Sequence, residues 1–118
     1  MQFNMPIACS EPEQDKVKAM DPTQMLSRSE EAEQFLKQLS NKTRLMVLCS
    51  LLEGERSVTE LLDNVPVTQP VLSQHLALLR EAEFVATRRS GQTIYYRLAD
   101  NRIIQIMNLL YGFFCADN

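Results

Sequence analysis

The chain has 118 residues, of which 45% are hydrophobic and 23% are charged, and its formal net charge is −3. This balance is typical of one globular domain and argues against a disordered chain or a protein that coats DNA through a large positive charge. No apolar run reaches the roughly 18 residues of a membrane span, and the N-terminus lacks the features of a signal peptide. We therefore expect a cytoplasmic protein whose three cysteines are reduced.

Residues 1–20 mix prolines and charged side chains without a sustained apolar period, which predicts a flexible N-terminal tail before a folded domain at 21–118. The first helix is predicted to begin at Asp21, because Asp is a good N-cap and Pro22 suits the first helical position. Its apolar side chains then fall on roughly one face: Leu26, Phe35, Leu36 and Leu39.

A second helix is predicted from Ser40 or Asn41 to Gly54, the expected C-terminal stop. Its nearly continuous apolar run, LMVLCSLL, places it in the core.

Two short capped helices follow. Ser57 and Glu60 have the spacing of a capping box and predict a helix over SVTELLDN, and after the tight connection 65–67, Thr68 caps a fourth helix with Pro70 in its first turn. Two such helices joined by a tight turn predict a helix-turn-helix. The side chains expected to point inward on the fourth helix are Val71, Leu72, Leu76, Leu79 and Ala82.

The pattern then changes to a period of two. Residues 84–89 and 93–98 are rich in β-branched and aromatic side chains, and Ser90-Gly91-Gln92 lies between them. This predicts a β-hairpin with glycine at its tip, in the position of a wing. The expected fold is mostly helical, with about five helices and a two-stranded wing.

A last helix is predicted to begin at Asp100, and its apolar side chains cover more than one face. A terminal helix of this kind needs a second surface to bury against. We expect a homodimer through the first and last helices.

These residues resemble the ArsR family of winged-helix repressors over about residues 30–115. The segment TQPVLSQHLALLREAEFV, residues 68–85, is similar to the family's recognition helix, and RRSGQTIYYRL, residues 88–98, is similar to its wing. The resemblance implies a repressor that binds double-stranded operator DNA. The family usually has glycine at the position of Glu83, where it ends the recognition helix in a left-handed turn; keeping that turn with glutamate costs on the order of 1 kcal/mol.

The chain's one positive segment is 68–99, with four arginines against two glutamates. A recognition helix reads base edges with side chains near its N-terminus, and a wing reaches backbone or minor groove. The candidate DNA contacts are Thr68, Gln69, Ser73, Gln74 and His75 on the helix and Arg88, Arg89 and Gln92 on the wing.

Two of these assignments have simple alternatives. Gln69 and Gln74 also suit the solvated face of any amphipathic helix. His75, the single histidine of the chain, lies beside Leu76 near the inner edge of the helix, so a hydrogen bond within the motif is as good an interpretation as DNA contact.

The cysteines do not have the spacing of a metal site. The third helix lacks the cysteine pair, and the last helix the histidine, that would resemble the family's metal sites, so we expect no metal and no other cofactor. Cys49 lies on an apolar stripe, where an inert buried cysteine is the usual occupant. Cys115 follows Phe114 at the end of the last helix, where access is better.

Two segments resemble the persulfide-sensing BigR/SqrR branch of the family: RLMVLCSLLEGERSVTEL around Cys49 and LLYGFFCADN around Cys115, with the cysteines 66 residues apart. The resemblance implies a dithiol pair. Sulfane sulfur converts one thiolate to a persulfide, a polysulfide link to the other thiol follows, and DNA affinity drops. Cys9, in the predicted tail, is expected to be dispensable.

The sequence leaves four alternatives to this function. A metal-sensing repressor of the same fold is one alternative, and an HlyU-like regulator with no sulfur inducer is another. An enzyme is disfavoured, because no base is placed to pair with a nucleophile and no phosphate-binding glycine loop is present. A pure protein-interaction module would leave the hairpin arginines without a purpose.

Overall fold

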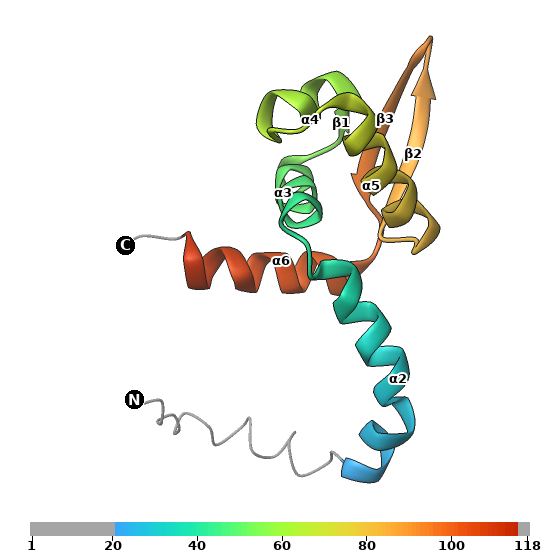
Figure 1. Cartoon of the computed structure of the whole chain (residues 1–118), viewed down its shortest axis with the longest axis vertical. Helices are drawn as coiled ribbons and strands as arrows, with labels where there is room; N and C mark the ends of the chain where they lie inside the picture. Colours follow the sequence, from blue (N-terminus) through green and yellow to red (C-terminus); the bar gives the residue numbers. More distant parts are fainter. Residues whose placement is uncertain (1–20, 116–118) are drawn as a thin grey trace. The chain divides into compact units, whose positions relative to one another are not determined.

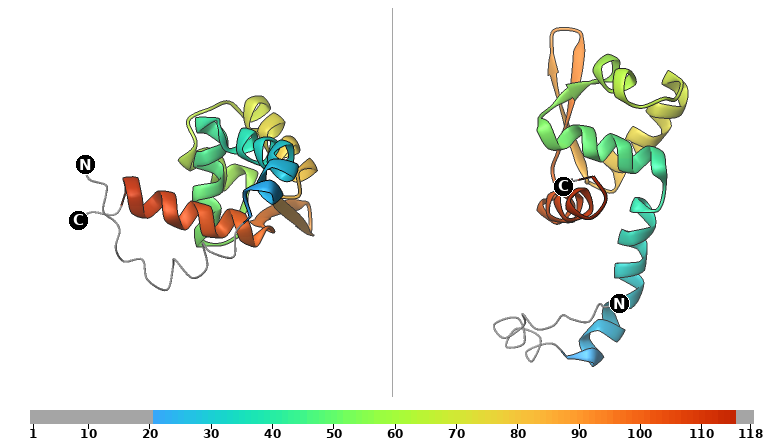
Figure 2. Two further views of the ribbon diagram at one scale, coloured as in Figure 1. Left: turned by 90° about the horizontal axis from the view of Figure 1, so that it is seen from below. Right: turned by 90° about the vertical axis from the view of Figure 1, so that its left-hand side faces the viewer.

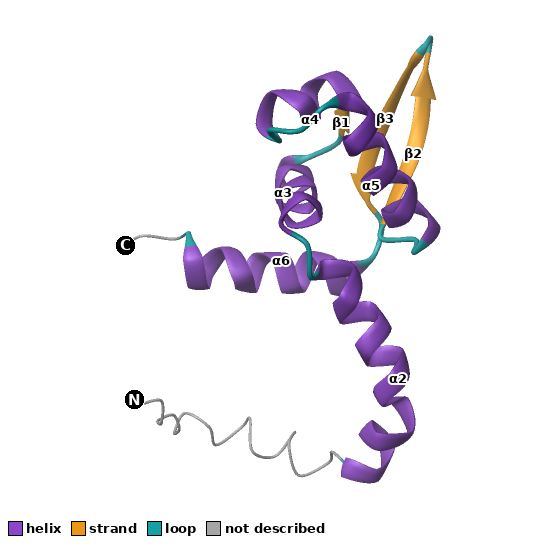
Figure 3. Ribbon diagram, viewed as in Figure 1, coloured by secondary structure: helices purple, strands orange, loops and turns teal. Residues whose placement is uncertain are grey.

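The computed structural model describes residues 21–115. The predicted tail at 1–20, Cys9 and residues 116–118 lie outside this range. Within it are five α-helices, one 3-10 turn and three strands, shown in Figure 1 and by type in Figure 3. In chain order they are α2 (Pro22–Leu39), α3 (Lys42–Ser50), η2 (Leu51–Glu53), β1 (Arg56–Ser57), α4 (Val58–Asn64), α5 (Gln69–Glu81), β2 (Val85–Ser90), β3 (Thr93–Leu98) and α6 (Asn101–Phe114).

The chain divides into two units, one ending at Phe35 and the other beginning at Leu36. The described part of the first unit is helical, and the prediction that it begins at Asp21 is confirmed, because the Asp21 carboxylate accepts a hydrogen bond from the Thr23 amide at 3.0 Å. Met25 and Leu26 of this segment are exposed.

The second unit is built around α3. Asn41 caps this helix by accepting a hydrogen bond from the Arg44 amide at 3.1 Å. Val47 and Leu48 are completely buried, because α3 packs against α4, α5 and α6. The predicted stop at Gly54 is confirmed, with the last turn before it narrowed to the 3-10 turn η2.

Helices α4 and α5 form the predicted helix-turn-helix. The Ser57 hydroxyl accepts from the Glu60 amide at 3.2 Å, and the Glu60 carboxylate accepts from the Ser57 amide at 2.8 Å, so the capping box is present. Leu72, Leu76 and Leu79 of α5 are buried as predicted. The expectation for Val71 is wrong: it is exposed, because it lies about 100° around the helix from Leu72.

The predicted wing is present, and it belongs to a sheet of three strands in the order β1-β3-β2. Strands β2 and β3 pair from Val85↔Leu98 to Ser90↔Thr93, which leaves a two-residue turn with Gly91 at a φ of 65°. The right-hand view of Figure 2 shows this hairpin as one extended ribbon. The two-stranded wing is thus confirmed, and the short strand β1, which was not predicted, adds to it by pairing with β3; two residues are too few for a visible alternation.

Helix α6 begins where predicted. The Asp100 carboxylate accepts from the Arg102 amide at 2.8 Å, and Ile103 and Met107 are buried. The distal half is different: Leu109, Phe113 and Phe114 are exposed.

None of the helices within 21–115 combines the length and hydrophobicity that a membrane crossing needs. The architecture is a winged helix-turn-helix.

The turn after α5 is closed at Glu83, which has a φ of 64°. The Phe84 amide donates to the Leu79 carbonyl at 2.9 Å, and the Glu83 amide donates to the Arg80 carbonyl at 2.9 Å, so the left-handed C-terminal motif is formed without glycine.

Glu83→Gly is therefore expected to raise the free energy of unfolding by about 1 kcal/mol, because glycine adopts this conformation without the Cβ clash. Urea denaturation measures the change. Glu83→Ala, which removes the charge but keeps the Cβ, serves as the control and should gain little. Equal effects of the two substitutions would show that charge, and not backbone strain, governs this position.

Candidate DNA-binding surface and thiol pocket

The first turns of α5 present the polar side chains that were predicted to read DNA. Thr68 is the N-cap, and it makes no side-chain capping hydrogen bond. Gln69, Ser73 and Gln74 are exposed, while three leucines of the same helix are buried: Leu72, Leu76 and Leu79. These side chains lie on the solvent face of α5, together with the free amides of its N-terminus. Both are accessible to a DNA duplex there.

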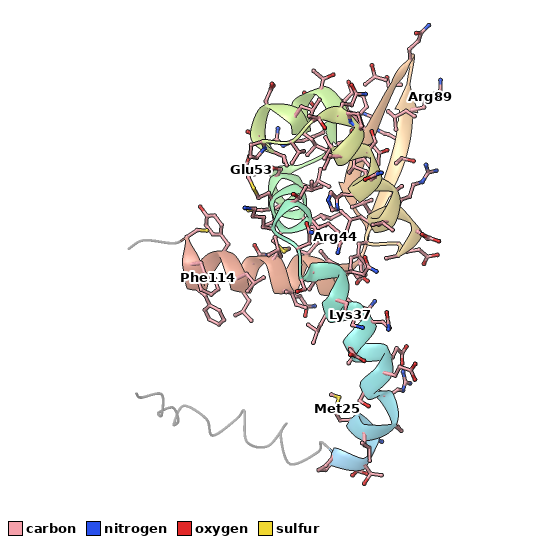
Figure 4. The ribbon with its side chains drawn as sticks, viewed as in Figure 1. Met25, Lys37, Arg44, Glu53, Arg89 and Phe114 are labelled. Carbon is pink, nitrogen blue, oxygen red and sulfur yellow. The ribbon has the colours of Figure 1, made fainter. Side chains whose placement is uncertain are left out.

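His75 is placed differently. It is half-buried, and its Nδ1 lies 3.4 Å from Nη1 of Arg44 on α3, whose Nε donates to the Gln38 carbonyl at 2.8 Å. Figure 4 labels Arg44 between α3 and α5. Burial, and then the Arg44 charge, lower the pKa of His75, so the imidazole is neutral at pH 7 and its Nδ1 accepts from Arg44. His75 thus bonds to α3, outside the helix-turn-helix of α4 and α5, and DNA contact by His75 stays a prediction.

The two wing arginines lie on opposite faces of the hairpin, because neighbouring residues of a strand alternate. Arg88 pairs across the strands with Tyr95 and Arg89 with Ile94. Arg88 donates from Nε to the Glu55 carboxylate at 2.7 Å, and its guanidinium lies 4.8 Å from the centre of the Tyr95 ring. The hydrogen bond from Arg88 lowers the pKa of Glu55, and the charges of Arg88 and Arg97 contribute less.

Arg89 lies on the face of the hairpin that turns toward α5. This face is identified by Tyr96, which has the same strand parity as Ile94 and lines a groove of about 470 Å³ with residues of α5. In Figure 4 Arg89 projects near the far end of the hairpin. Sequence reasoning missed this groove, because no local pattern links a wing strand to the middle of a helix. Its lining is Ser73, Ala77, Arg80, Glu81 and Tyr96.

Cys49 of α3 and Cys115, the C-cap of α6, line one pocket of about 270 Å³. Both are free thiols; Cys115 is exposed and Cys49 is partly buried. Burial raises the pKa of the Cys49 thiol, and the nearby Cys115 and Glu53 add to the shift, so little of it is ionised at pH 7. The other lining side chains are all apolar or aromatic: Leu45, Met46, Met107, Leu110, Tyr111 and Phe114.

The part of the chain described here, 21–115, holds no cluster of three or more His, Cys, Asp or Glu side chains that could bind a metal ion. The expectations of no metal, no other cofactor and no enzymatic activity stay predictions.

A winged helix-turn-helix with an exposed, polar recognition helix defines a class of DNA-binding regulators. The family model described as "Bacterial regulatory protein, arsR family" matches residues 41–87, which run from the N-cap of α3 into β2. Over 92 residues the chain is 47% identical to the biofilm growth-associated repressor of Xylella fastidiosa, covering 78% of this chain and 81% of that protein. The chain belongs to the arsR family and is a DNA-binding transcriptional repressor of it.

The chain is also similar to other transcriptional regulators. The transcriptional activator HlyU of Vibrio cholerae is 38% identical over 99 residues, covering 84% of this chain and 92% of that protein. Among solved structures, the transcriptional repressor BigR from Xylella fastidiosa matches 83% of this chain and 100% of its own, with a TM-score of 0.76 and 45% identity. Reduced HlyU from Vibrio cholerae matches 79% of this chain and 98% of its own, with a TM-score of 0.75 and 39% identity.

The neutral His75 predicts a pH dependence of stability. Because its pKa is lower in the folded state than the ordinary 6.5, the unfolded state binds more protons, and its contribution to stability is lost as the pH falls below 6.5. His75→Asn keeps an acceptor for Arg44 but does not titrate, so its stability should fall less between about pH 7 and about pH 5.5.

Urea denaturation at the two pH values checks this. The carboxylates of Glu55 and Asp100 have lowered pKa values, so their contributions are lost only below their ordinary values of 4.5 and 3.8, outside this window. An identical pH dependence in the two proteins would refute the assignment of a neutral, Arg44-bound His75.

Proposed function

We propose that the chain acts as a dimeric repressor that binds operator DNA in its dithiol form and releases it when persulfides or other sulfane sulfur link Cys49 to Cys115. The observation that carries this proposal is that two thiols from α3 and α6 line one apolar pocket. The family membership supplies the DNA-binding role, and the BigR repressor of Xylella fastidiosa is among the solved structures that the chain resembles.

The DNA-binding surface is assigned to the N-terminus of α5 and to one face of the wing. Gln69 and Gln74 have the amide geometry to pair with adenine, and Ser73 can serve several bases. Thr68 and the first-turn amides suit a phosphate. Arg89 and Gln92 are exposed at the outer part of the hairpin. Arg88 is expected to contribute less, since Glu55 already holds it, and His75 is expected to position α5 through Arg44.

Dimerisation is supported by the apolar surface that each terminal helix leaves exposed. On α6, Phe114 is 80% exposed and Phe113 is 67% exposed. On α2, Leu26 is 73% exposed. Side chains of this size rarely stay in water over so short a segment, and a second copy of the chain would cover them.

The sulfur chemistry needs no oxidant beyond the persulfide. A cysteine thiolate attacks the outer sulfur of R–S–SH, the S–S bond breaks, and RS⁻ leaves and is protonated. Two further transfers lengthen the chain, and the second cysteine then attacks it and displaces HS⁻. In sum, two protein thiols and three persulfides give one tetrasulfide bridge, three thiols and one hydrogen sulfide.

The bridge would change DNA affinity through α3. This helix packs against α5 on one side and α6 on the other, and the bridge would tie it to α6. In a dimer held through α6, a shift of α3 changes the separation of the two recognition helices, which must match half-sites roughly 34–36 Å apart.

Substitutions of the cysteines test the sensing function. Glutathione persulfide should reduce operator affinity at least about tenfold, a loss of about 1.4 kcal/mol, for the unmodified chain and for Cys9→Ser. Cys49→Ser and Cys115→Ser should bind operator normally and not respond. Gel shift or fluorescence anisotropy measures binding, and intact mass should show two added sulfur atoms and two lost hydrogens.

Peroxide is the control oxidant and should leave the mass and the affinity unchanged. A response that survives in Cys49→Ser or Cys115→Ser would overturn the dithiol mechanism. Binding that is indifferent to sulfur in every protein would favour the HlyU-like alternative without a sulfur inducer, and release by zinc, copper(I) or arsenite would favour the metal sensor.

The two faces of the wing predict unequal roles for its arginines. Arg89→Ala should weaken binding to operator and to unrelated duplex alike and lower the salt slope of log K by about one, as expected for one lost phosphate contact. Arg88→Ala is the matched control, with the same charge lost one residue away, and should change the slope less. A larger effect for Arg88→Ala would place the other face of the hairpin against DNA.

A further inference from the structure

Cys49 lines a second pocket, on the side toward α4. This pocket has a volume of about 320 Å³ and shares only Met46 and Cys49 with the apolar pocket. Cys49 therefore lines two pockets that differ in their lining: Cys115 and apolar side chains line the first, and the second also has charged and amide groups. The second pocket, called the polar pocket below, is lined by Met46, Cys49, Ser50, Glu53, Arg56 and Asn64.

Arg56 is the cation of the polar pocket, and its position is fixed by the backbone. Its Nε donates to the Ser50 carbonyl at 3.0 Å, and its Nη2 donates to the Glu53 carboxylate at 2.8 Å. The Arg56 side chain is 26% exposed and that of Glu53 is 80% exposed. An ion pair with so exposed a carboxylate contributes little stability, so another carboxylate can exchange for Glu53 at the guanidinium fork.

We propose that the polar pocket binds the small persulfide that delivers sulfur to Cys49, and that this donor is a carboxylate-bearing R–S–SH held by Arg56 and Asn64. The inference rests on the proposed function, because it presumes that Cys49 accepts sulfur. The Cys49 thiolate attacks the outer sulfur, the donor S–S bond breaks, and RS⁻ leaves and takes a proton. The balance is Cys49–SH + R–SSH → Cys49–SSH + R–SH.

The surroundings of Cys49 explain why a bound donor is needed. Burial keeps most of this thiol protonated, and Glu53 further disfavours its thiolate. A thiol of this kind reacts slowly with reagents that merely collide with it. A donor whose carboxylate replaces Glu53 at Arg56 holds its sulfur beside Cys49, which raises the effective concentration of the reagent. The new persulfide then faces Cys115 across the apolar pocket.

The experiment isolates Cys49 in a Cys9→Ser, Cys115→Ser background and compares two donors. Glutathione persulfide carries carboxylates, and the persulfide of an uncharged alkyl thiol does not. Intact mass spectrometry gives the second-order rate constant for the first added sulfur. The quantity of interest is the rate constant for glutathione persulfide divided by the rate constant for the uncharged alkyl persulfide. A change in the pKa of Cys49 affects both donors and leaves this ratio unchanged.

Asn64→Asp places a negative charge at the pocket and should lower the ratio about fivefold. Glu53→Gln removes the carboxylate that competes for Arg56 and should raise it. Thr59→Asp is the matched control: it adds the same charge to an exposed position of α4 that is not part of the lining, and should leave the ratio unchanged. The opposite signs of the first two variants keep the test valid if one of them is poorly folded.

Two results would overturn the inference, and they are distinguishable. If Cys49 takes up sulfur at a ratio that neither Asn64→Asp nor Glu53→Gln changes, the polar pocket does not select the donor, while the dithiol mechanism stands. If the chain with all its cysteines gains no sulfur from either donor and keeps its operator affinity, the proposed function and the polar pocket fail together.

Discussion

The burial of α3 on two sides is the constraint on which the rest of the second unit depends. Val47 and Leu48 have no exposed surface, because the helix-turn-helix covers one side of α3 and α6 covers another. Protein interiors are close-packed, so α3 cannot shift toward α6 without disturbing its contacts with α5. This packing makes Cys49 a sensitive position, because it lies on a helix that contacts both α5 and α6, the helix that ends at Cys115.

Two arginines link α3 to the elements around it. Arg44 joins the carbonyl at the end of α2 to His75 on α5, and Arg56 joins the end of α3 to β1. Each uses a guanidinium to bond a helix-terminal carbonyl, which no intrahelical amide can satisfy. Exposed ion pairs such as Arg88–Glu55 add little free energy. Their effect is on geometry, since Glu55 fixes the direction of the Arg88 guanidinium on the face that strand alternation gives it.

Local signals could be predicted from the sequence, and long-range placement could not. The Ser57–Glu60 capping box, the Asp100 cap and the hairpin depend on residues within a few positions of one another, and all are present. Strand β1 was missed because two residues carry no periodicity. The separation of Arg88 from Arg89 follows from strand alternation once the strand is known. That Tyr96 and Arg80 line one groove depends on how β3 packs beside α5, which no spacing along the chain encodes.

The thiol pocket illustrates the same limit and suggests why a sulfur signal differs from peroxide in the proposed mechanism. The family resemblance pointed to Cys49 and Cys115 as a pair, but only the fold shows that α3 and α6 place them in the lining of one apolar pocket. A direct disulfide needs Cα atoms roughly 4.4–6.8 Å apart, and each inserted sulfur extends the reach by about 2 Å. Peroxide adds no sulfur, so it can yield only an oxidised single thiol or a direct disulfide. In the proposed mechanism a persulfide supplies the sulfur atoms that lengthen the bridge, so two thiols that line one apolar pocket favour a sulfur chain over a direct disulfide.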